Sequence, residues 1–332
     1  MTSVLAKKRA AFVALLFMVC TGLAATSIPA SAAVAKASGT VNVAYAASLT
    51  FLNEKVVSPA FTAADGYNFS GFGMPSGALE AEIAAGVIHP NVFESVGGDN
   101  ITPLEPKFTK WYIQYAATSI VVAYNPHSKY ASQFNAYATG KLPLAGLFKL
   151  LETPGLRLGR TDPNIDPQGR DFIEMLELAQ SHYHLPSNTV AKILGTTNFG
   201  TANSSEIFSE SGLDSILESG QLDAASAFVT QAIELHLNYV KLPAVINLGS
   251  FADAARYHQA SVTIKGGVVK HGSPQVIDIT IIGTPTPAAL AFVEYTLSAV
   301  GLAEYKNGGF TMLKPTLTGS GVPAAILSEL GG

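Results

Sequence analysis

The sequence predicts an α/β protein in which strands and helices alternate around a mainly parallel sheet. Short runs rich in small and β-branched residues are followed repeatedly by runs with apolar residues at helical spacing, the pattern typical of βα units. The chain has 332 residues, of which 48% are hydrophobic and 13% charged, enough for a large buried core. We therefore expect a globular protein with two domains or lobes.

The N-terminus has the features of a secretory signal peptide. Basic residues 7–9 precede an apolar run over residues 10–25, and residues 30–32 form a small-x-small cleavage signal. We expect residues 1–32 to be a signal peptide, so the mature protein is secreted across the cytoplasmic membrane and is periplasmic or on the cell surface. A membrane anchor is the alternative, but the apolar run is shorter than a bilayer span.

Charge and cysteine usage exclude several classes of partner. Removing residues 1–32 would take the formal net charge from −4 to −7, because that segment holds three basic residues and no acidic ones. An acidic protein without a basic stripe is not expected to bind nucleic acid. The one cysteine, Cys20, lies in the signal segment, so the mature chain would have no disulfide and no thiol site. We expect it to be a monomer.

The first strands of the mature chain end in small polar residues. Residues 41–46 are expected to form a strand that leads into a helix with an irregularity at Ser58-Pro59, and residues 67–72 and 91–96 are the next strands. A helix over residues 78–86 separates the second strand from the third. Helical spacing and β-branched runs predict further strands at 111–115, 119–124, 156–159, 222–229, 261–264 and 276–282, and helices at 129–137, 144–151, 167–184, 213–218, 231–237 and 287–306.

Three serines follow these first strands. Ser48, Ser76 and Ser95 are expected at the carboxyl ends of the strands, where ligands bind in open α/β sheets. Ser48 and Ser76 also lie at strand-to-helix junctions, where backbone N–H groups and the helix dipole can bind an anion. A plain helix N-cap is the alternative for both.

Asp166 lies where a loop becomes a helix. Pro163 and Pro167 flank it, so residues 164–166 are expected to be extended and Pro167 to be the first helical residue. This position makes Asp166 a natural N-cap. The two interpretations are a carboxylate turned onto its own helix and a carboxylate turned toward a ligand.

Glu210 lies in a comparable position. Ser211 and Asp214 resemble a capping pair for the helix expected at 213–218, which places Glu210 just before a helix N-terminus. The alternative is a solvated glutamate on a polar turn. The Gly-, Thr-, Asn- and Ser-rich segment 195–205 that precedes this turn is expected to be a loop.

The sequence favours binding over catalysis. It contains no Gly-x-Ser-x-Gly, no Gly-x-x-x-x-Gly-Lys-Ser/Thr and no His-Glu-x-x-His motif. His182 and His184 are two residues apart near a helix end and face different sides, which is poor geometry for a shared metal ion. We expect no cofactor and no enzymatic activity; a secreted enzyme is the less favoured alternative.

Several segments together resemble the tungstate/molybdate-binding proteins of ABC importers. They occur in the same order along the mature chain, and the Asn-x-Asp-Pro-x-Gly core is the most specific of them. The segments are Trp111-Tyr112, residues 121–125, Ser128-Lys129-Tyr130-Ala131, Pro154-Gly155, residues 162–169, residues 217–220, Tyr239, Leu242-Pro243 and residues 246–249.

The resemblance implies a two-lobe class II periplasmic-binding-protein fold, in which two α/β lobes joined by two crossing segments close on the ligand about a hinge. Residues 40–120 plus 250–332 would form lobe 1, and residues 121–249 would form lobe 2. The function implied is that of an extracellular or periplasmic substrate-binding protein, with a small oxyanion as ligand and the permease subunits of an ABC importer as partners.

By motif position, Asp166 and Glu210 would add carboxylate oxygens to the metal of a tungstate or molybdate ion. The hydroxyl contacts would be Ser48 and Ser76, with Ser95 as a further candidate. Mo(VI) and W(VI) are hard centres suited to oxygen ligands. Sulfate and phosphate cannot accept extra ligands, so the carboxylates would discriminate against them.

Two residues depart from the family pattern. Phe228 stands where the family usually has a tyrosine, so one hydroxyl contact is missing, and Arg170 stands where the family often has a tyrosine. Both departures favour the alternative of a receptor for another small anion or an organic solute on the same fold.

Overall fold

The computed structural model describes residues 38–195 and 207–330. The contacts within the chain divide it into two units, Met1–Ala35 and Lys36–Gly332, and every described residue belongs to the second. The expected signal peptide and most of the loop expected at 195–205 lie outside the described residues. Among the helices that are described, none is long and apolar enough to cross a membrane.

A mixed six-stranded sheet is built mainly from the first part of the chain. Its strands are β1 (Thr40–Ala46), β2 (Asn68–Met74), β3 (Val92–Val96), β4 (Trp111–Ala117), β12 (Val276–Ile281) and β13 (Thr311–Gly319). Their order across the sheet is β13-β4-β12-β3-β1-β2. β1 runs parallel to β2 and β3, whereas β12 pairs antiparallel with both β3 and β4, and β13 pairs antiparallel with β4.

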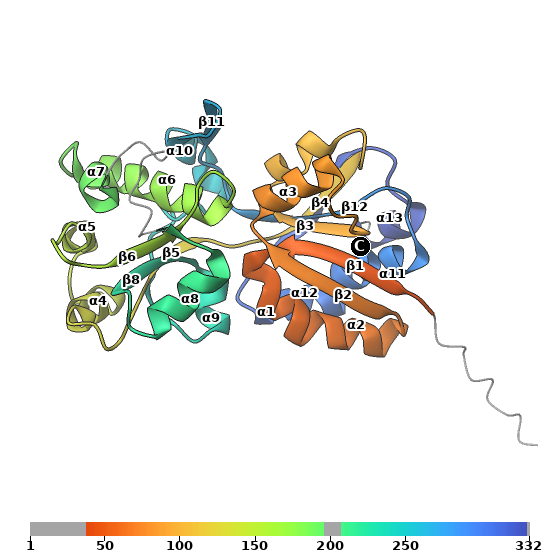
Figure 1. Ribbon diagram of the computed structural model, residues 1–332, viewed down its shortest axis with the longest axis horizontal. Helices are drawn as coiled ribbons and strands as arrows, with labels where there is room; N and C mark the ends of the chain where they lie inside the picture. The colour runs from red at the N-terminus through yellow and green to blue at the C-terminus, as the bar shows by residue number, and fades with distance from the viewer. Residues whose placement is uncertain (1–37, 196–206, 331–332) are drawn as a thin grey trace, which may run out of the picture. The chain divides into compact units, whose positions relative to one another are not determined.

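Helices cover both faces of this sheet (Figure 1). On one face, Leu79 of α3 (Ser76–Ala85) packs in a cluster with Phe93 of β3. On the other face, Phe61 lies edge-to-face with Phe292. The remaining helices of this part are η1 (Ala47–Leu49), α1 (Thr50–Leu52), η2 (Asn53–Val57), α2 (Ser58–Asp65), η3 (Gly98–Asn100), η4 (Thr102–Leu104), α11 (Pro287–Leu297), α12 (Ala299–Asn307) and α13 (Ala324–Leu330).

A second mixed sheet has five strands. They are β5 (Ile120–Tyr124), β6 (Leu158–Thr161), β7 (Ile207–Phe208), β8 (Ala224–Phe228) and β9 (Asn238–Val240). The order is β7-β6-β8-β5-β9, with β6 parallel to β7 and β8, and β5 antiparallel to β8 and β9. Its helices are α4 (Ala131–Ala138), α5 (Ala145–Leu151), α6 (Pro167–His182), α7 (Thr189–Leu194), α8 (Glu210–Glu218) and α9 (Val229–Glu234).

The two sheets form two lobes, and backbone hydrogen bonds tie together the segments that run between them. Thr118 N donates to Gln275 O at 2.9 Å, and Gln275 N donates to Leu248 O at 2.7 Å. Ile120 N donates to Asn247 O at 2.9 Å. The chain leaves the first sheet after β4, and it returns to that sheet through the segment that precedes β12.

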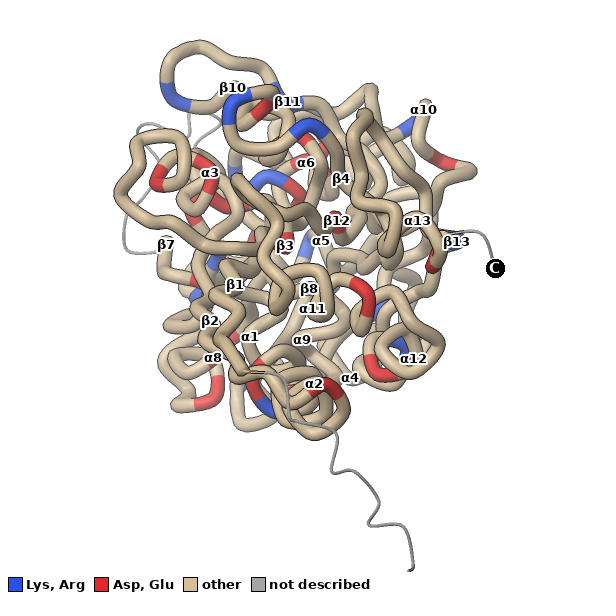
Figure 2. Tube along the Cα trace, turned by 90° about the vertical axis from the view of Figure 1, so that its right-hand side faces the viewer, with Lys and Arg blue, Asp and Glu red and all other residues tan. Residues whose placement is uncertain are grey.

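A small subdomain precedes this return. It comprises η6 (Phe251–Asp253), α10 (Ala254–Tyr257), β10 (Ser261–Ile264) and β11 (Val268–His271). α10 and β10 contact α6, and Ser261 N donates to Glu177 Oε2 at 2.9 Å. Figure 2 shows the basic positions of the hairpin β10–β11, and Lys270 Nζ lies 2.6 Å from Asp99 Oδ2. The lobe ranges 40–120 plus 250–332 and 121–249 remain a prediction.

The structure corrects the expected secondary structure in several places. The sheets are mixed rather than mainly parallel. The strands next to the crossings between the lobes, β4, β5 and β12, are antiparallel to their neighbours. The helix expected over 287–306 is two helices, since Ser298 has extended backbone (ψ 163°) and caps α12 through Gly301 N. β13 is an additional strand, and Pro315 is tolerated within it because β13 lies at the sheet edge with a register shift between Met312 and Thr316.

Candidate functional site

The expected site residues lie where strands give way to helices. Ser48 is in η1, directly after β1, and Ser76 is the first residue of α3, after β2. Asp166 caps α6, which follows β6, and Glu210 begins α8, which follows β7. All four positions are beyond the carboxyl ends of parallel strands, where open α/β sheets bind ligands.

Contacts between elements bring these four positions to one region. Gly77 N, next to Ser76, donates to the carbonyl oxygen of Ile165, next to Asp166, at 3.1 Å. A Cβ atom at Gly77 would lie 2.8 Å from that oxygen, so glycine permits the approach. α8 and α9 both contact η1, which carries Ser48.

Asp166 uses its two carboxylate oxygens differently. The residue is extended (φ −122°, ψ 120°), and its Oδ1 accepts a hydrogen bond from Gln168 N at 2.9 Å, which confirms the predicted N-cap. Its Oδ2 is buried and has no hydrogen-bond partner among the described residues. The neighbouring hydroxyl of Thr161 interacts with this carboxylate and lowers its pKa. The cap therefore leaves one buried oxygen available for a ligand.

The environment of Asp166 disfavours its ionised form. Burial raises the pKa of Asp166 to about 6, against the opposing effects of the Gln168 N–H, of Thr161 and of the positive charge on Arg170. Side-chain exposure is only 2%, so water does not solvate the carboxylate. A buried acid without full compensation is typical of functional sites.

Glu210 is buried at the start of α8, and this rules out the solvated-turn interpretation. The helix begins earlier than expected: Ser209 is the N-cap and accepts from Gly212 N at 3.2 Å, so the predicted cap at Ser211 is wrong. Both serines suit the cap position by sequence, and the local pattern does not choose between them. Glu210 thus lies in the first turn, where the helix dipole favours a negative charge.

The two carboxylates interact electrostatically. Burial raises the pKa of Glu210 well above its usual range, and the negative charges of Asp166 and Asp214 raise it further, while a hydrogen bond from Gln231 opposes the shift. The structure therefore brings Asp166 and Glu210 into one site, although 44 positions separate them in the sequence. An anion alone would be repelled by such a pair.

A buried amide network supports Glu210 and was not predicted from the sequence. Gln168 Nε2 donates to Glu210 Oε1 at 3.3 Å and to Gln231 Oε1 at 2.6 Å. Ser226 Oγ donates to Gln168 Oε1 at 2.9 Å, and Phe228 N donates to Gln231 Oε1 at 3.1 Å. The available signal was a glutamine within the Asp-Pro-Gln-Gly motif, in the first turn of a helix otherwise expected to bury apolar residues.

The serines differ in how far their hydroxyls are occupied. Ser76 Oγ accepts from Val96 N at 3.1 Å, which leaves its proton free to donate to a ligand. Ser48 is 4% exposed in η1. Ser95 is buried, and its Oγ donates to Gly97 O at 3.0 Å. Its hydroxyl proton is therefore already used in a hydrogen bond within its own loop.

Phe228 and Arg170 occupy different environments. The Phe228 side chain is 1% exposed and belongs to the main apolar core, and its backbone N–H, not its ring, joins the Gln231 network. Arg170 is buried in α6, and its charge lowers the pKa of Asp166. In the described ranges 38–195 and 207–330, no cluster of three His, Cys, Asp or Glu residues could hold a metal ion.

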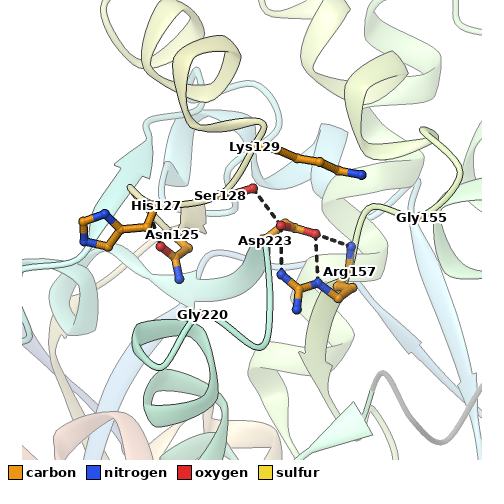
Figure 3. A pocket seen from close by; sticks show the side chains of 8 residues that line it. All are labelled: Asn125, His127, Ser128, Lys129, Gly155, Arg157, Gly220 and Asp223. Carbon is orange, nitrogen blue, oxygen red and sulfur yellow. Dashed lines mark hydrogen bonds and ion pairs between the residues drawn. The ribbon is translucent and has the colours of Figure 1, made fainter.

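A separate pocket of about 360 Å³ lies where β5 ends and β6 and β8 begin. Asp166 follows the carboxyl end of β6, so the pocket and Asp166 lie at opposite ends of this strand. Figure 3 shows Asp223 between Ser128 and Arg157. Asp223 Oδ1 accepts from Ser128 Oγ at 2.7 Å, and Arg157 donates to Asp223 through N, Nε and Nη2. Burial alone would raise the pKa of Asp223, but these hydrogen bonds outweigh it and lower the pKa.

Asp223 and Asp166 are both buried, but they differ in how many hydrogen-bond donors contact their carboxylates. Asp223 is saturated with donors and ties loops together, whereas Asp166 keeps an unpartnered oxygen. Motif residues Asn125, Ser128 and Gly220 line the Asp223 pocket, so part of the family resemblance reflects this loop network and not the ligand site.

The sequence profile of the family described as Bacterial extracellular solute-binding protein matches residues 41–311. The chain belongs to this family. The members of this family are solute receptors and not enzymes, and the match includes strands of both sheets.

The relatives of this solute-binding protein whose names state a ligand are distant. It is 28% identical over 242 residues to the molybdate/tungstate-binding protein WtpA of Pyrococcus abyssi, covering 67% of each chain. It is 32% identical over 169 residues to a putative ABC transporter molybdenum-binding protein of Haloferax volcanii, covering 51% of this chain and 50% of the relative.

Solved structures confirm the two-lobe periplasmic-binding-protein fold. The periplasmic molybdate-binding protein of Azotobacter vinelandii matches with a TM-score of 0.55 at 19% identity, covering 82% of this chain and 99% of the other. The periplasmic binding protein AgtB of an Agrobacterium, solved with agropinic acid, matches with a TM-score of 0.51 at 11% identity, covering 82% and 83%. At these identities the solute-binding protein shares the fold, and the ligand must be argued from its own residues.

Proposed function

We propose that this protein is the solute receptor of an ABC importer and that it captures tungstate or molybdate between its lobes. Asp166 and Glu210 would coordinate the metal of the oxyanion, and the hydroxyls of Ser48 and Ser76 would hold its oxo oxygens. Permease subunits of the importer are the partners this role implies. The names of the relatives from Pyrococcus abyssi and Haloferax volcanii support this class of ligand.

The observation that carries the proposal is the unpartnered Oδ2 of Asp166. A buried carboxylate oxygen without a donor costs free energy, on the order of a few kcal/mol, unless a ligand compensates it. Glu210 beside it raises this cost, because like charges repel in a medium of low dielectric constant. Two buried carboxylates in this arrangement suit a positively charged centre.

A tetrahedral dianion is a suitable ligand only if its central atom can accept more oxygens. Two carboxylates would repel the oxo oxygens, and the formal charge of the whole chain, −4, gives no compensation. W(VI) and Mo(VI) are hard, highly charged centres that take further oxygen ligands. The hydroxyls of Ser48 and Ser76 would then donate to the oxo oxygens.

The same pair gives selectivity. Sulfur in sulfate and phosphorus in phosphate accept no added carboxylate, so binding either anion would leave two buried negative charges facing a third. We expect this penalty to amount to several kcal/mol, an estimate on the order of the cost of an unpaired buried charge.

Titration calorimetry of the mature protein with tungstate, molybdate, sulfate and phosphate tests this function. Heat of binding for tungstate and molybdate, with affinities at least about a hundredfold above those for sulfate and phosphate, roughly 2.7 kcal/mol, is the expected result. Equal affinities for tungstate and sulfate, or no binding of tungstate, would contradict the proposal.

Arg170 favours a second candidate. Its buried positive charge lies close enough to Asp166 to lower the pKa of that residue, and a guanidinium suits an organic carboxylate or another small anion. In that case the carboxyl groups would act as protonated donors. Binding of an organic acid but not of tungstate in the same calorimeter would support this candidate.

A further inference from the structure

Gln168 contacts both carboxylates of the proposed site. Its backbone N–H donates to Asp166 Oδ1 at 2.9 Å, and its side-chain Nε2 donates to Glu210 Oε1 at 3.3 Å. The residue is 1% exposed, so water cannot replace these donors. One residue therefore supplies a hydrogen-bond donor to each of two neighbouring carboxyl groups.

The backbone N–H of Phe228 determines which atom is donor and which is acceptor in each hydrogen bond of the Gln168 network. The backbone N–H of Phe228 can only donate, so the Gln231 oxygen that it contacts at 3.1 Å is an acceptor. The Gln168 atom 2.6 Å from the same oxygen must then be the amide nitrogen. Gln168 Oε1 consequently faces Ser226 Oγ, which donates to it at 2.9 Å.

The orientation of the Gln168 amide determines how Glu210 is hydrogen-bonded. Because Gln168 presents its amide nitrogen, Glu210 Oε1 is the acceptor of this bond, and Gln231 also hydrogen-bonds to the Glu210 carboxyl. The network joins residues of α6, β8, α8 and α9, all of them at most 5% exposed. An apolar side chain of the same size would fill the volume but would remove one of the hydrogen bonds that orient Glu210 relative to Asp166.

We propose that Gln168 is a positioning residue for oxyanion binding, fixing the side chain of Glu210 and so the relative orientation of Glu210 and Asp166. The inference rests on the proposed function. Partners of metal-coordinating groups act in this way, because they select one orientation of the coordinating atom and strengthen it as a ligand.

A double-mutant cycle with Gln168→Met and Glu210→Gln, read as tungstate affinity by calorimetry, tests this inference. Methionine keeps the volume and the backbone N–H to Asp166 and removes only the amide. We expect Gln168→Met to weaken tungstate binding by about ten- to a hundredfold in the wild-type background. In the Glu210→Gln background it should weaken binding less than about threefold, because Gln168 acts through the carboxylate that is already absent.

The matched control is Gln180→Met, on the same helix but near Val190, away from the site. We expect it to leave tungstate affinity unchanged. Equal losses from Gln168→Met in the two backgrounds would mean that the amide only supports the fold, and an unchanged affinity in the wild-type background would mean that it has no role. Either result overturns the inference while tungstate binding by the wild-type protein, and hence the proposed function, stands.

Ser226→Ala is the second variant, in case Gln168→Met does not fold. It removes the hydroxyl that donates to Gln168 Oε1 and leaves every other residue of the network unchanged. A three- to tenfold loss of tungstate affinity with an unchanged unfolding temperature supports the positioning role, and unchanged affinity contradicts it. If the wild-type protein binds no tungstate at all, the proposed function fails and this inference fails with it.

Discussion

Asp166 shows how one side chain can be both a structural cap and a ligand. Oδ1 accepts from Gln168 N, and Oδ2 is buried without a partner among the described residues. The two interpretations that the sequence left open are therefore not exclusive. Because asparagine caps helices as well as aspartate does, the cap and the charge can be separated experimentally.

Asp166→Asn should abolish most of the tungstate affinity and stabilise the ligand-free protein. The folded pKa, about 6, lies above the ordinary value of 3.8, so the folded protein loses stability as the pH rises from about 4 to about 6 and does not regain it above. Removing the charge should raise the free energy of unfolding at pH 7 by up to about 3 kcal/mol. Binding should weaken at least tenfold, roughly 1.4 kcal/mol.

Urea unfolding and calorimetry on the same Asp166→Asn preparation give both quantities. A cap without a ligand role would leave tungstate affinity unchanged in this variant. Asp166→Ala is the control for the cap itself and should lose about 1 kcal/mol of the stability that asparagine retains.

Glu210→Gln should weaken tungstate binding at least tenfold, roughly 1.4 kcal/mol, for the same reason as the change at Asp166. Calorimetry checks it. Glu218→Gln, at the exposed end of the same helix, is the matched control and should bind as the wild type does. Equal affinities of Glu210→Gln and Glu218→Gln would remove Glu210 from the site.

At the scale of elements, the site depends on close approach between helix starts. Gly77 N bonds to Ile165 O, and the absence of a Cβ atom at Gly77 allows this contact. Gly169 has the same role within the second lobe, because a Cβ atom there would lie 2.4 Å from Thr161 O. These two glycines set how closely α3 and α6 approach the site.

Gly77→Ala should therefore weaken tungstate binding with little effect on folding. The added methyl group would push Ile165 away, and with it Asp166, by several tenths of an ångström. We expect about a tenfold loss in affinity, roughly 1.4 kcal/mol, and an unfolding temperature within about 2 °C of the wild type. Differential scanning calorimetry with and without tungstate measures both; a large loss of stability without ligand would show that the glycine serves the fold instead.

Elements with strong local signals were predictable from the sequence, and those fixed by distant partners were not. The prolines around Asp166 determine α6 and its cap because they restrict the backbone locally. The start of α8 was misplaced because both Ser209 and Ser211 suit a cap. The Gln168 network was missed, since its partners lie 42 to 63 positions away.

At the scale of the whole molecule, alternation of strands and helices predicted the α/β class but not the strand directions. Directions depend on where the chain crosses between sheets, and β4, β5 and β12 reverse there. The sequence did not predict that the backbone N–H of Phe228 donates to Gln231, because Gln231 is placed there by the fold.

Tungstate affinity should rise with pH across the range in which the carboxylates ionise. Burial raises the pKa of Asp166 to about 6 and that of Glu210 well above its usual range, and coordination of a metal requires both to be ionised. We expect at least a tenfold gain in affinity between about pH 5.5 and pH 8, measured at micromolar tungstate. A protein that used protonated carboxyl groups as donors to an anion would show the opposite slope.

The central claim is that Asp166 and Glu210 bind the metal and not the oxo oxygens. X-ray absorption spectroscopy at the tungsten edge of the protein–tungstate complex tests it most directly. We predict a coordination shell enlarged beyond the tetrahedral oxyanion by longer carboxylate bonds, and a return toward the tetrahedral spectrum in Glu210→Gln. A purely tetrahedral spectrum in the wild-type complex would contradict the claim.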